Sequence, residues 1–565
     1  LITENELKFA LQMQKQTRDK LGEVLVKNNI VSEEDMARTL AYQLEVDYVD
    51  LNKMNIPQEL SHVIMRNTAR KNHLVPIQKQ GDSLYIAMDD PLNYYAIDEV
   101  RKVTKLRIVP MIATESAVDR AITNLYGNEG AHQAIHDILS ERSEHATAGG
   151  RVSTSNTNAF DFVISTNVIG DDTESAPTIR LVNSIIERAV AEHASDIHFE
   201  PREHEMDVRM RIDGIMRDIL NVPGDIMVSV IARVKTMANI DVAEKRIPQD
   251  GRFAVSALGK SIDMRVSTLP IAWGEKVVCR LLDKSNTNVD KQDLGMTPDD
   301  MRKYDKLIHY HNGVLLIVGP TGSGKSTTMY SMLNELNTRD VNIVTLEDPI
   351  EYNVDGLNQV QINPKIDMTF ASGLRAILRQ DPDIVSVGEI RDGETAEIAM
   401  RAALTGRFML STIHTNDAVG AIERLEDIGI EPYLVSSTLR GVISQRLVRR
   451  ICPHCGEEYY PQRDEQMRLG LEYDPDRTFK FGKGCQHCYD TGYSGRIAVY
   501  EILTVTPKIR DLIYAKASRS DIEEELKTKE SDFVSLKDNA LKLVEEGVTT
   551  SFEALRIINE VDFTD

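Results

Sequence analysis

The sequence predicts a multidomain α/β protein whose C-terminal half is a nucleotide-binding domain. Three observations lead to this fold class. At 565 residues the chain is too long for a single core, because domains average roughly 100–200 residues. From Leu294 onward, short apolar strands alternate with helical patterns, which is typical of a parallel sheet covered by helices. One of these strands, Val314–Val318, runs directly into a glycine-rich loop.

The composition is that of a globular, strongly acidic protein. Hydrophobic residues make up 41% and charged residues 27%, and the net charge is -22. A protein that grips nucleic acid needs a basic face, so we expect no nucleic-acid partner. A nucleic-acid translocase remains an alternative, but it would need stacking aromatics, and aromatic residues amount to 5%.

The sequence pattern predicts a cytoplasmic protein. We find neither an apolar run of about 18–20 residues, the length needed to cross a bilayer, nor a basic-then-apolar signal segment. Because the chain begins at Leu1 and not at methionine, we also expect residues to be missing before it.

Four segments are expected along the chain. The first is an N-terminal α+β domain over residues 1–126, in which residues 1–14 resemble residues 30–43 at an offset of about 29. Each copy starts a helix, with Thr3 or Ser32 as N-cap. A linker rich in Gly, Ser, Thr and Asn is expected over 127–175. A small α+β domain over 176–285 and the α/β domain over 294–565 complete the chain.

The glycine-rich loop has the full G-x-x-x-x-G-K-S pattern between a strand and a helix. Its backbone N–H groups and the helix N-terminus are suited to bind phosphates. We expect Lys325 to reach the β- and γ-phosphates and the Ser326 hydroxyl to ligate Mg²⁺. The residues expected to bind nucleotide are Gly319, Pro320, Thr321, Gly322, Ser323, Gly324, Lys325, Ser326 and Thr327.

Three polar side chains follow other strands of the same domain. Glu347 ends the strand over 342–346, Glu389 follows the strand over 383–387, and His414 follows the strand over 408–413. The carboxyl ends of parallel strands meet at one edge of a sheet, where ligands bind. We therefore expect these side chains beside the phosphates, with His414 sensing the γ-phosphate. Asp383 lies at the opposite end of its strand and is the weaker candidate for metal binding.

Two C-x-x-C pairs, Cys452/Cys455 and Cys485/Cys488, stand about 30 residues apart. Two such pairs close a tetrahedral Zn²⁺ site with no open position, so we expect a structural zinc element over 452–488. His454 and His487 are alternative ligands. The fifth cysteine, Cys279, lies in an apolar strand and is expected to be a small buried residue.

At these motifs the chain resembles the ATPases of type II secretion and type IV pilus assembly, over residues 176–500. The phosphate loop, the acidic segment 347–351, the strand end 383–392 and the histidine segment 411–415 match in order. The small domain matches in ASDIHFEP (194–201) and RMRIDG (209–214).

This resemblance implies several features of fold and mechanism. It implies a homohexamer of RecA-like P-loop cores, each preceded by a small PAS-like α+β domain that closes over ATP. Glu389 would act on Mg²⁺ and its water and Glu347 would orient or deprotonate the attacking water, although the two roles can be exchanged. Arg211 and Arg217 would reach the phosphates, since cationic groups stabilise a transferring phosphoryl group.

The N-terminal domain and the cysteine element favour pilus assembly within this family. Retraction motors lack both features, whereas assembly (extension) and secretion ATPases have this layout. The resemblance thus implies an ATP hydrolase that drives pilin extraction and polymerisation, held at the inner membrane by a membrane-anchored platform protein. A type II secretion ATPase is the runner-up, and a nucleotide switch with negligible turnover is another alternative.

The N-terminal repeat also resembles motifs that bind cyclic di-GMP. The segment Lys20–Ile30 reads KLGEVLVKNNI, with Lys20 where arginine is usual and Asn29 where glycine is expected. Lysine lacks the planar fork that stacks on guanine and binds phosphate in a bidentate way. We therefore expect this domain to dock a platform partner in preference to binding cyclic di-GMP.

Overall fold

The computed structural model describes residues 21–126, 177–283, 290–528 and 531–562 except 29 and 55, together with Ile135 and single positions before residue 21. Apart from Ile135, the expected linker lies outside the described residues, and so do Lys20 and Asn29. The chain divides into two compact units, Leu1–Asp283 with Gly484–Thr491, and Lys284–Lys483 with Gly492–Asp565.

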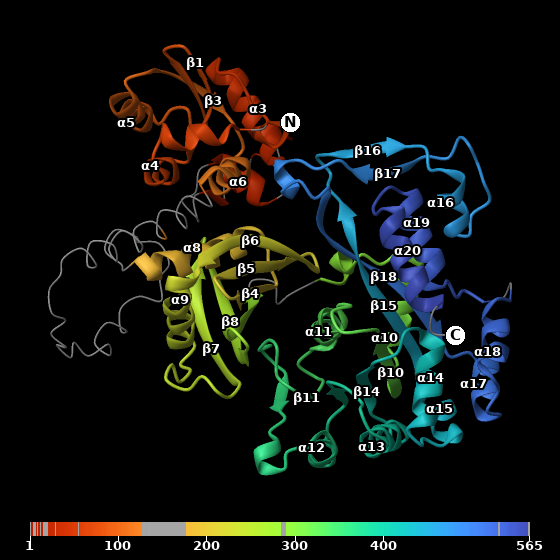
Figure 1. Ribbon diagram of the computed structural model, residues 1–565. Helices are drawn as coiled ribbons and strands as arrows, with labels where there is room; N and C mark the ends of the chain where they lie inside the picture. Colours follow the sequence, from red (N-terminus) through yellow and green to blue (C-terminus); the bar gives the residue numbers. More distant parts are fainter. Residues whose placement is uncertain are drawn as a thin grey trace. The chain divides into compact units, whose positions relative to one another are not determined.

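The N-terminal part of the first unit is the expected α+β fold (Figure 1). Its sheet has the order β1-β2-β3, with β1 antiparallel and β3 parallel to β2. Ser32 caps a helix as expected, because its side chain accepts a hydrogen bond from the Asp35 N–H. The elements are α2 (Leu21–Lys27), α3 (Glu33–Leu44), α4 (Arg66–Lys71), β1 (Leu74–Gln80), β2 (Ser83–Met88), α5 (Tyr94–Thr104), β3 (Arg107–Ile112) and α6 (Glu115–Tyr126).

The rest of the first unit is built on a six-stranded antiparallel sheet of order β6-β5-β4-β9-β8-β7. The sequence has strand-like segments at 196–199, 207–212, 261–267 and 276–282, which correspond to β4, β5, β8 and β9, but it predicts neither β6 nor β7. Most residues of β7 are exposed or half-exposed, and only Val255 and Ala257 near its end are buried. Its sequence therefore lacks the alternation of apolar and polar residues that predicts a strand with one buried face. The elements are α8 (Pro177–Ala191), β4 (Asp196–Pro201), β5 (Glu205–Ile212), β6 (Ile215–Pro223), α9 (Gly224–Met237), β7 (Gln249–Ala257), β8 (Lys260–Ile271) and β9 (Gly274–Asp283).

The second unit contains a seven-stranded sheet of order β12-β11-β13-β14-β10-β15-β18. Every neighbouring pair is parallel except β15 with β18. The strands are β10 (Gly313–Val318), β11 (Ile343–Glu347), β12 (Asn358–Gln361), β13 (Ile384–Val387), β14 (Phe408–Ile413), β15 (Leu439–Ile451) and β18 (Tyr493–Thr504). The helices of this sheet region are α10 (Pro298–Ile308), α11 (Lys325–Leu336), α12 (Phe370–Ile377), α13 (Gly393–Leu404), α14 (Ala418–Asp427) and α15 (Pro432–Thr438).

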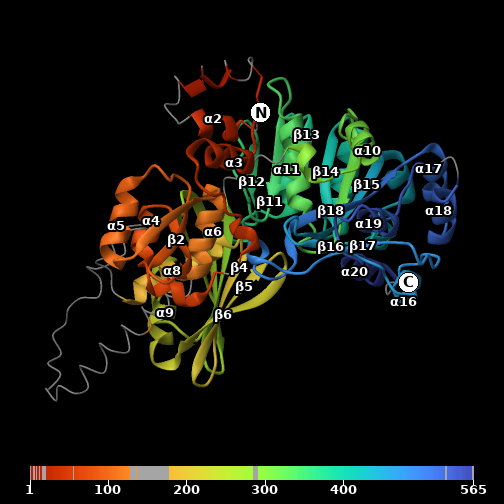
Figure 2. The ribbon, with the colours of Figure 1, turned by 90° about the horizontal axis from the view of Figure 1, so that it is seen from above.

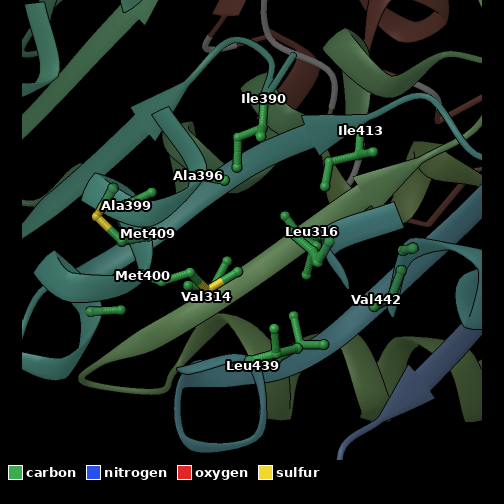
Figure 3. Packing of buried hydrophobic residues seen from close by; sticks show 14 of the residues in the cluster. Val314, Leu316, Ile390, Ala396, Ala399, Met400, Met409, Ile413, Leu439 and Val442 are labelled. Carbon is green, nitrogen blue, oxygen red and sulfur yellow. The ribbon is translucent and has the colours of Figure 1, made fainter. Parts of the chain in front are cut away.

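Helices cover both faces of this sheet, and β10 shows how. Successive side chains of a strand point to opposite faces. Val314 and Leu316 pack with Met400 of α13 and Val442 of β15 on one face, as Figure 3 shows. Leu315 and Ile317 belong to the cluster on the other face, which includes residues of α10 and α11. In Figure 2 these two helices lie beside the strands β13, β14 and β15. Full burial on both faces explains why β10 is continuously apolar.

The remaining elements of the second unit follow α15. The described residues there form a two-stranded sheet of β16 (Gly456–Tyr459) and β17 (Phe479–Gly482), together with the helices α16 (Arg463–Arg468), α17 (Pro507–Tyr514), α18 (Arg519–Leu526), α19 (Leu536–Glu545) and α20 (Ser551–Asp562). Among all the described helices, none has the length and apolar character required of a membrane span.

Candidate nucleotide site and cysteine cluster

The phosphate loop connects the carboxyl end of β10 to the N-terminus of α11. Gly324 is the N-cap of the helix, with φ 91°, and Gly322 has φ 81°. Both angles lie in the left-handed region, where a side chain would be strained. At Gly319 a Cβ atom would lie 2.5 Å from the Gln445 carbonyl oxygen, so only glycine fits. The glycines of the motif are therefore required by the backbone path of the loop.

Lys325 folds back over this loop. Its ammonium group donates to the carbonyl oxygens of Gly319, at 2.7 Å, and Pro320, at 2.9 Å. Burial lowers the pKa of Lys325 to about 8; the Glu389 carboxylate acts against this change and the Arg446 guanidinium adds to it. Next to it, Ser326 is exposed on the first turn of α11. The loop thus presents a cation and a hydroxyl at a helix N-terminus, as a phosphate site requires.

Glu389 and His414 come together at the ends of adjacent strands. The backbone N–H of Ile390 donates to the Thr412 carbonyl at 2.9 Å, which ties the segment after β13 to the end of β14. His414 Nε2 lies 3.3 Å from Glu389 Oε2, and Arg391 forms an ion pair with the same carboxylate. The Glu389 carboxylate also acts electrostatically on Lys325, whose pKa it raises against the effect of burial.

Glu347 lies at the end of β11 with its carboxylate fully engaged. Oε1 accepts hydrogen bonds from the Thr345 hydroxyl at 2.5 Å and from Gln359 Nε2 at 3.1 Å. Oε2 accepts one from the Tyr330 hydroxyl, on the helix that follows the phosphate loop. Burial and this bond to Glu347 raise the pKa of Tyr330, so the phenol stays a donor. In this arrangement Glu347 is hydrogen-bonded to Tyr330 of α11, and both of its carboxylate oxygens accept hydrogen bonds from side chains.

The two candidate arginines belong to the six-stranded sheet of the first unit. Arg211 on β5 donates to the Gly214 carbonyl at 2.8 Å, and its Nε lies 3.8 Å from Asp196 Oδ2. Arg217 on β6 pairs with Met210 in the ladder. Asp383 is at the far end of β13, as expected, where it accepts a bond from the Asn342 N–H at 2.8 Å.

The four cysteines of the C-x-x-C pairs form one cluster, in which all four sulfur atoms lie within 4.8 Å of one another. Cys452 and Cys455 follow β15, and Cys485 and Cys488 lie on the turn that precedes β18. The Sγ atoms of the latter two are 3.7 Å apart. Four sulfurs around Zn²⁺ at about 2.3 Å are separated by about 3.8 Å, so the donor set fits a tetrahedral metal.

Cys279 stands apart from this cluster. It is 2% exposed, and burial raises the pKa of its thiol to about 12. The prediction of a small buried residue is confirmed.

Sequence reasoning missed the contribution of β15 to the candidate nucleotide site. Gln445 and Arg446 of this strand are 1% and 4% exposed and contact the phosphate loop and the segment after His414. A sequence signal existed, because buried polar residues within an apolar strand must find partners. Tyr330 was missed as well, since a tyrosine on an amphipathic helix is ordinarily a packing residue.

Comparison with known proteins places these features in a family. Residues 171–561 match the family described as "Type II/IV secretion system protein", and residues 44–132 match the MshEN domain. The type IV pilus assembly ATPase PilB of Myxococcus xanthus is 38% identical over 98% of this chain and 96% of its own length. The type II secretion system protein E of Pseudomonas aeruginosa is 43% identical over 85% of this chain and 93% of its own.

A solved structure supports the fold. The ATPase DotB of Legionella pneumophila aligns with a TM-score of 0.51 and 22% identity, over 69% of this chain and 98% of its own. The core is thus that of a secretion-type ATPase, preceded by an MshEN domain. The family match covers the phosphate loop, both acidic strand ends and His414. This chain therefore belongs to the type II/IV secretion system protein family, and it is an ATP hydrolase.

Proposed function

We propose that this ATPase powers type IV pilus assembly, using ATP hydrolysis to drive pilin extraction and polymerisation at the inner face of the cytoplasmic membrane. The observation that carries the proposal is the match to the pilus assembly ATPase of Myxococcus xanthus, which extends over 98% of this chain and 96% of the relative. That match includes the N-terminal domain. Type II secretion is the second candidate, favoured by the 43% identity to the Pseudomonas aeruginosa protein.

A Lys325→Ala substitution at the native locus separates the two candidates. Lys325 donates to the phosphate loop and supplies its cation, so its loss should abolish nucleotide binding without exposing the core. Surface pili are counted by electron microscopy, and exported enzymes are assayed in the medium. Loss of pili with normal export supports pilus assembly. Loss of export with normal pili supports type II secretion and refutes the proposal.

For catalysis, we infer that Glu389 acts on Mg²⁺ and its bound water together with the Ser326 hydroxyl. The inference is supported by the electrostatic action of Glu389 on Lys325 and by its contact with His414. His414 would sense the γ-phosphate from that position. Glu347 is assigned the orientation of the attacking water, which requires its carboxylate to exchange the Tyr330 bond for water.

Glu389→Gln tests these roles, with Glu397→Gln as control. Both residues form ion pairs with an arginine, but the pair of Glu397 with Arg401 is exposed and joins two residues of α13. The amide keeps the shape of the side chain and removes its negative charge. We expect at least a hundredfold lower kcat in Glu389→Gln with ADP binding retained, and no change in the control. Hydrolysis at the parent rate would refute the assignment. A larger loss in Glu347→Gln would exchange the two roles.

The assembly proposed is a homohexamer in which the small domain over 176–285, of PAS-like type, closes over ATP bound by the core over 294–565. Arg211 and Arg217 would then reach the phosphates. Arg211 would exchange the Gly214 carbonyl for phosphate oxygens, which bind a guanidinium more strongly. Sedimentation of the full chain with a nonhydrolysable ATP analogue tests the hexamer. Arg211→Lys, which keeps the charge and loses the planar fork, tests the contact by kcat.

We assign Zn²⁺ to the cluster of Cys452, Cys455, Cys485 and Cys488, as a structural metal. The support is the mutual approach of four sulfurs and the burial of three of these cysteines. Four thiolates so close together repel one another unless a cation is bound. The metal would join the end of β15 to the start of β18.

The N-terminal domain over residues 1–126 is assigned to docking on a membrane-anchored platform protein, which would keep the ATPase peripheral to the inner membrane. Cyclic di-GMP is the competing ligand for this domain. The MshEN match starts at residue 44, after the segment Lys20–Ile30 that carries the altered motif. Titration of the full chain with cyclic di-GMP separates the two roles, because saturable micromolar binding would favour the ligand over docking alone.

A further inference from the structure

Strand β15 extends beyond the end of β10, beside the phosphate loop. The two strands are parallel, and the last pair of their ladder joins Val318 to Ser444. Because β10 ends there, the next residue of β15, Gln445, lies beside the loop and not beside a strand. The close approach of Gly319 to the Gln445 carbonyl oxygen results from this register.

The side chain of Gln445 joins the loop to the first turn of α11. Its Nε2 donates to the Ser323 carbonyl at 2.7 Å, and its Oε1 accepts from the Thr328 hydroxyl at 2.8 Å. The two partners fix the orientation of the amide, because a carbonyl only accepts. The amide and the Thr328 hydroxyl are both buried, so each would be costly to leave unpaired.

The bond to Ser323 also sets the direction of a neighbouring donor. In a trans peptide unit the C=O and the following N–H point in opposite directions. Since the Ser323 carbonyl points at Gln445, the N–H of Gly324 points away from β15. This N–H is one of the loop donors that the motif supplies to phosphate.

We propose that Gln445 is a positioning residue, which orients the Gly324 peptide unit so that its N–H is preset to bind the nucleotide phosphates. Gln445 touches no phosphate in this role and acts through the loop. The inference rests on nucleotide binding by the phosphate loop and adds a residue from a strand more than a hundred positions later in the chain.

The adjacent residue supports a wider role of β15 in the site. Arg446 donates from Nη2 to the Asn416 carbonyl at 2.9 Å, two residues after His414. Its charge also contributes to the lowered pKa of Lys325. Neighbouring residues of one strand thus bind the phosphate loop and the residue that follows the histidine segment, which fixes these two parts of the site relative to each other.

Gln445→Met tests the proposal, because methionine keeps the length and removes both hydrogen bonds. Gln462→Met is the matched control, since the Gln462 side chain makes no capping bond to its helix. The readouts are the KM for ATP and the Kd for ADP of the full chain. A donor to phosphate acts in ground state and transition state alike. We therefore expect both constants to rise about 10- to 100-fold, with kcat changed less than threefold.

A purely structural role of Gln445 gives a different result. It would reduce the fraction of folded enzyme and hence the apparent kcat, with KM and Kd unchanged, and that result would overturn the proposal. If Gln445→Met fails to fold, Thr328→Val removes the second hydrogen bond of the Gln445 amide, which fixes the orientation in which Nε2 faces Ser323, and Thr328→Ser retains that bond as a control. Equal ADP affinity in these two variants would also overturn it. If the parent chain does not bind ADP, that result would instead refute nucleotide binding by the phosphate loop, on which this inference rests.

Discussion

The buried carboxylate of Glu501 makes the stability of the core depend on pH. Glu501 lies on β18, with one oxygen accepting the Ala418 N–H at 2.8 Å and the other the Leu536 N–H at 3.0 Å. These donors begin the helices α14 and α19. Burial raises the pKa of Glu501 to about 7, against the two backbone bonds, which lower it.

The size and sign of the effect follow from linkage. The ordinary pKa of 4.5 applies to the unfolded chain and a pKa of about 7 to the folded chain. The folded state therefore holds the proton more tightly, so this contribution to stability is complete below pH 4.5 and is lost as the pH rises to 7. At about 1.4 kcal/mol per pH unit, the total change is about 3 kcal/mol.

Glu501→Gln isolates this contribution, because glutamine does not titrate. The midpoints of thermal unfolding of parent and variant are compared between pH 5 and pH 8, with Glu545→Gln on the exposed side of α19 as control. We expect the stability of the parent relative to the variant to increase steadily as the pH falls from 8 to 5. A difference that does not vary with pH would refute the reasoning, since the carboxylate would then have the same pKa in both states.

Two further predictions concern buried charge and metal. Lys235 is 1% exposed and donates a hydrogen bond to Glu275 at 2.7 Å. Because Lys235→Met leaves the Glu275 charge buried without this partner, it should lower the free energy of unfolding of the small domain by about 3–5 kcal/mol in chemical unfolding. Adding Glu275→Leu should restore most of this loss. Arg401→Met, which breaks an exposed pair, should cost less than about 1 kcal/mol, and equal losses would contradict the argument. Elemental analysis of the purified protein should find one Zn²⁺ per chain. The zinc should be lost in Cys452→Ser and retained in the control Cys279→Ser. A parent protein without zinc would overturn the metal assignment.

The sequence alone determined the parts of this protein that are contiguous in the chain. The phosphate loop is recognisable because its glycines, lysine and serine lie within eight consecutive positions, 319–326, between a strand and a helix. The C-x-x-C pairs and the strand ends at Glu347, Glu389 and His414 were found for the same reason. Most strands of the ATPase sheet were located correctly, because burial on both faces makes them continuously apolar.

The tertiary structure alone decided which distant side chains meet. Gln445 and Ser323 are 122 positions apart, and Glu501 reaches the start of α14 across 83 positions. No local pattern reports such pairs, because their partners depend on the strand order that places β15 beside β10. The same holds for Tyr330, whose bond to Glu347 links the phosphate-loop helix to the end of β11. Strand β7 escaped prediction because its residues are largely exposed, which removes the apolar periodicity from which strands are inferred.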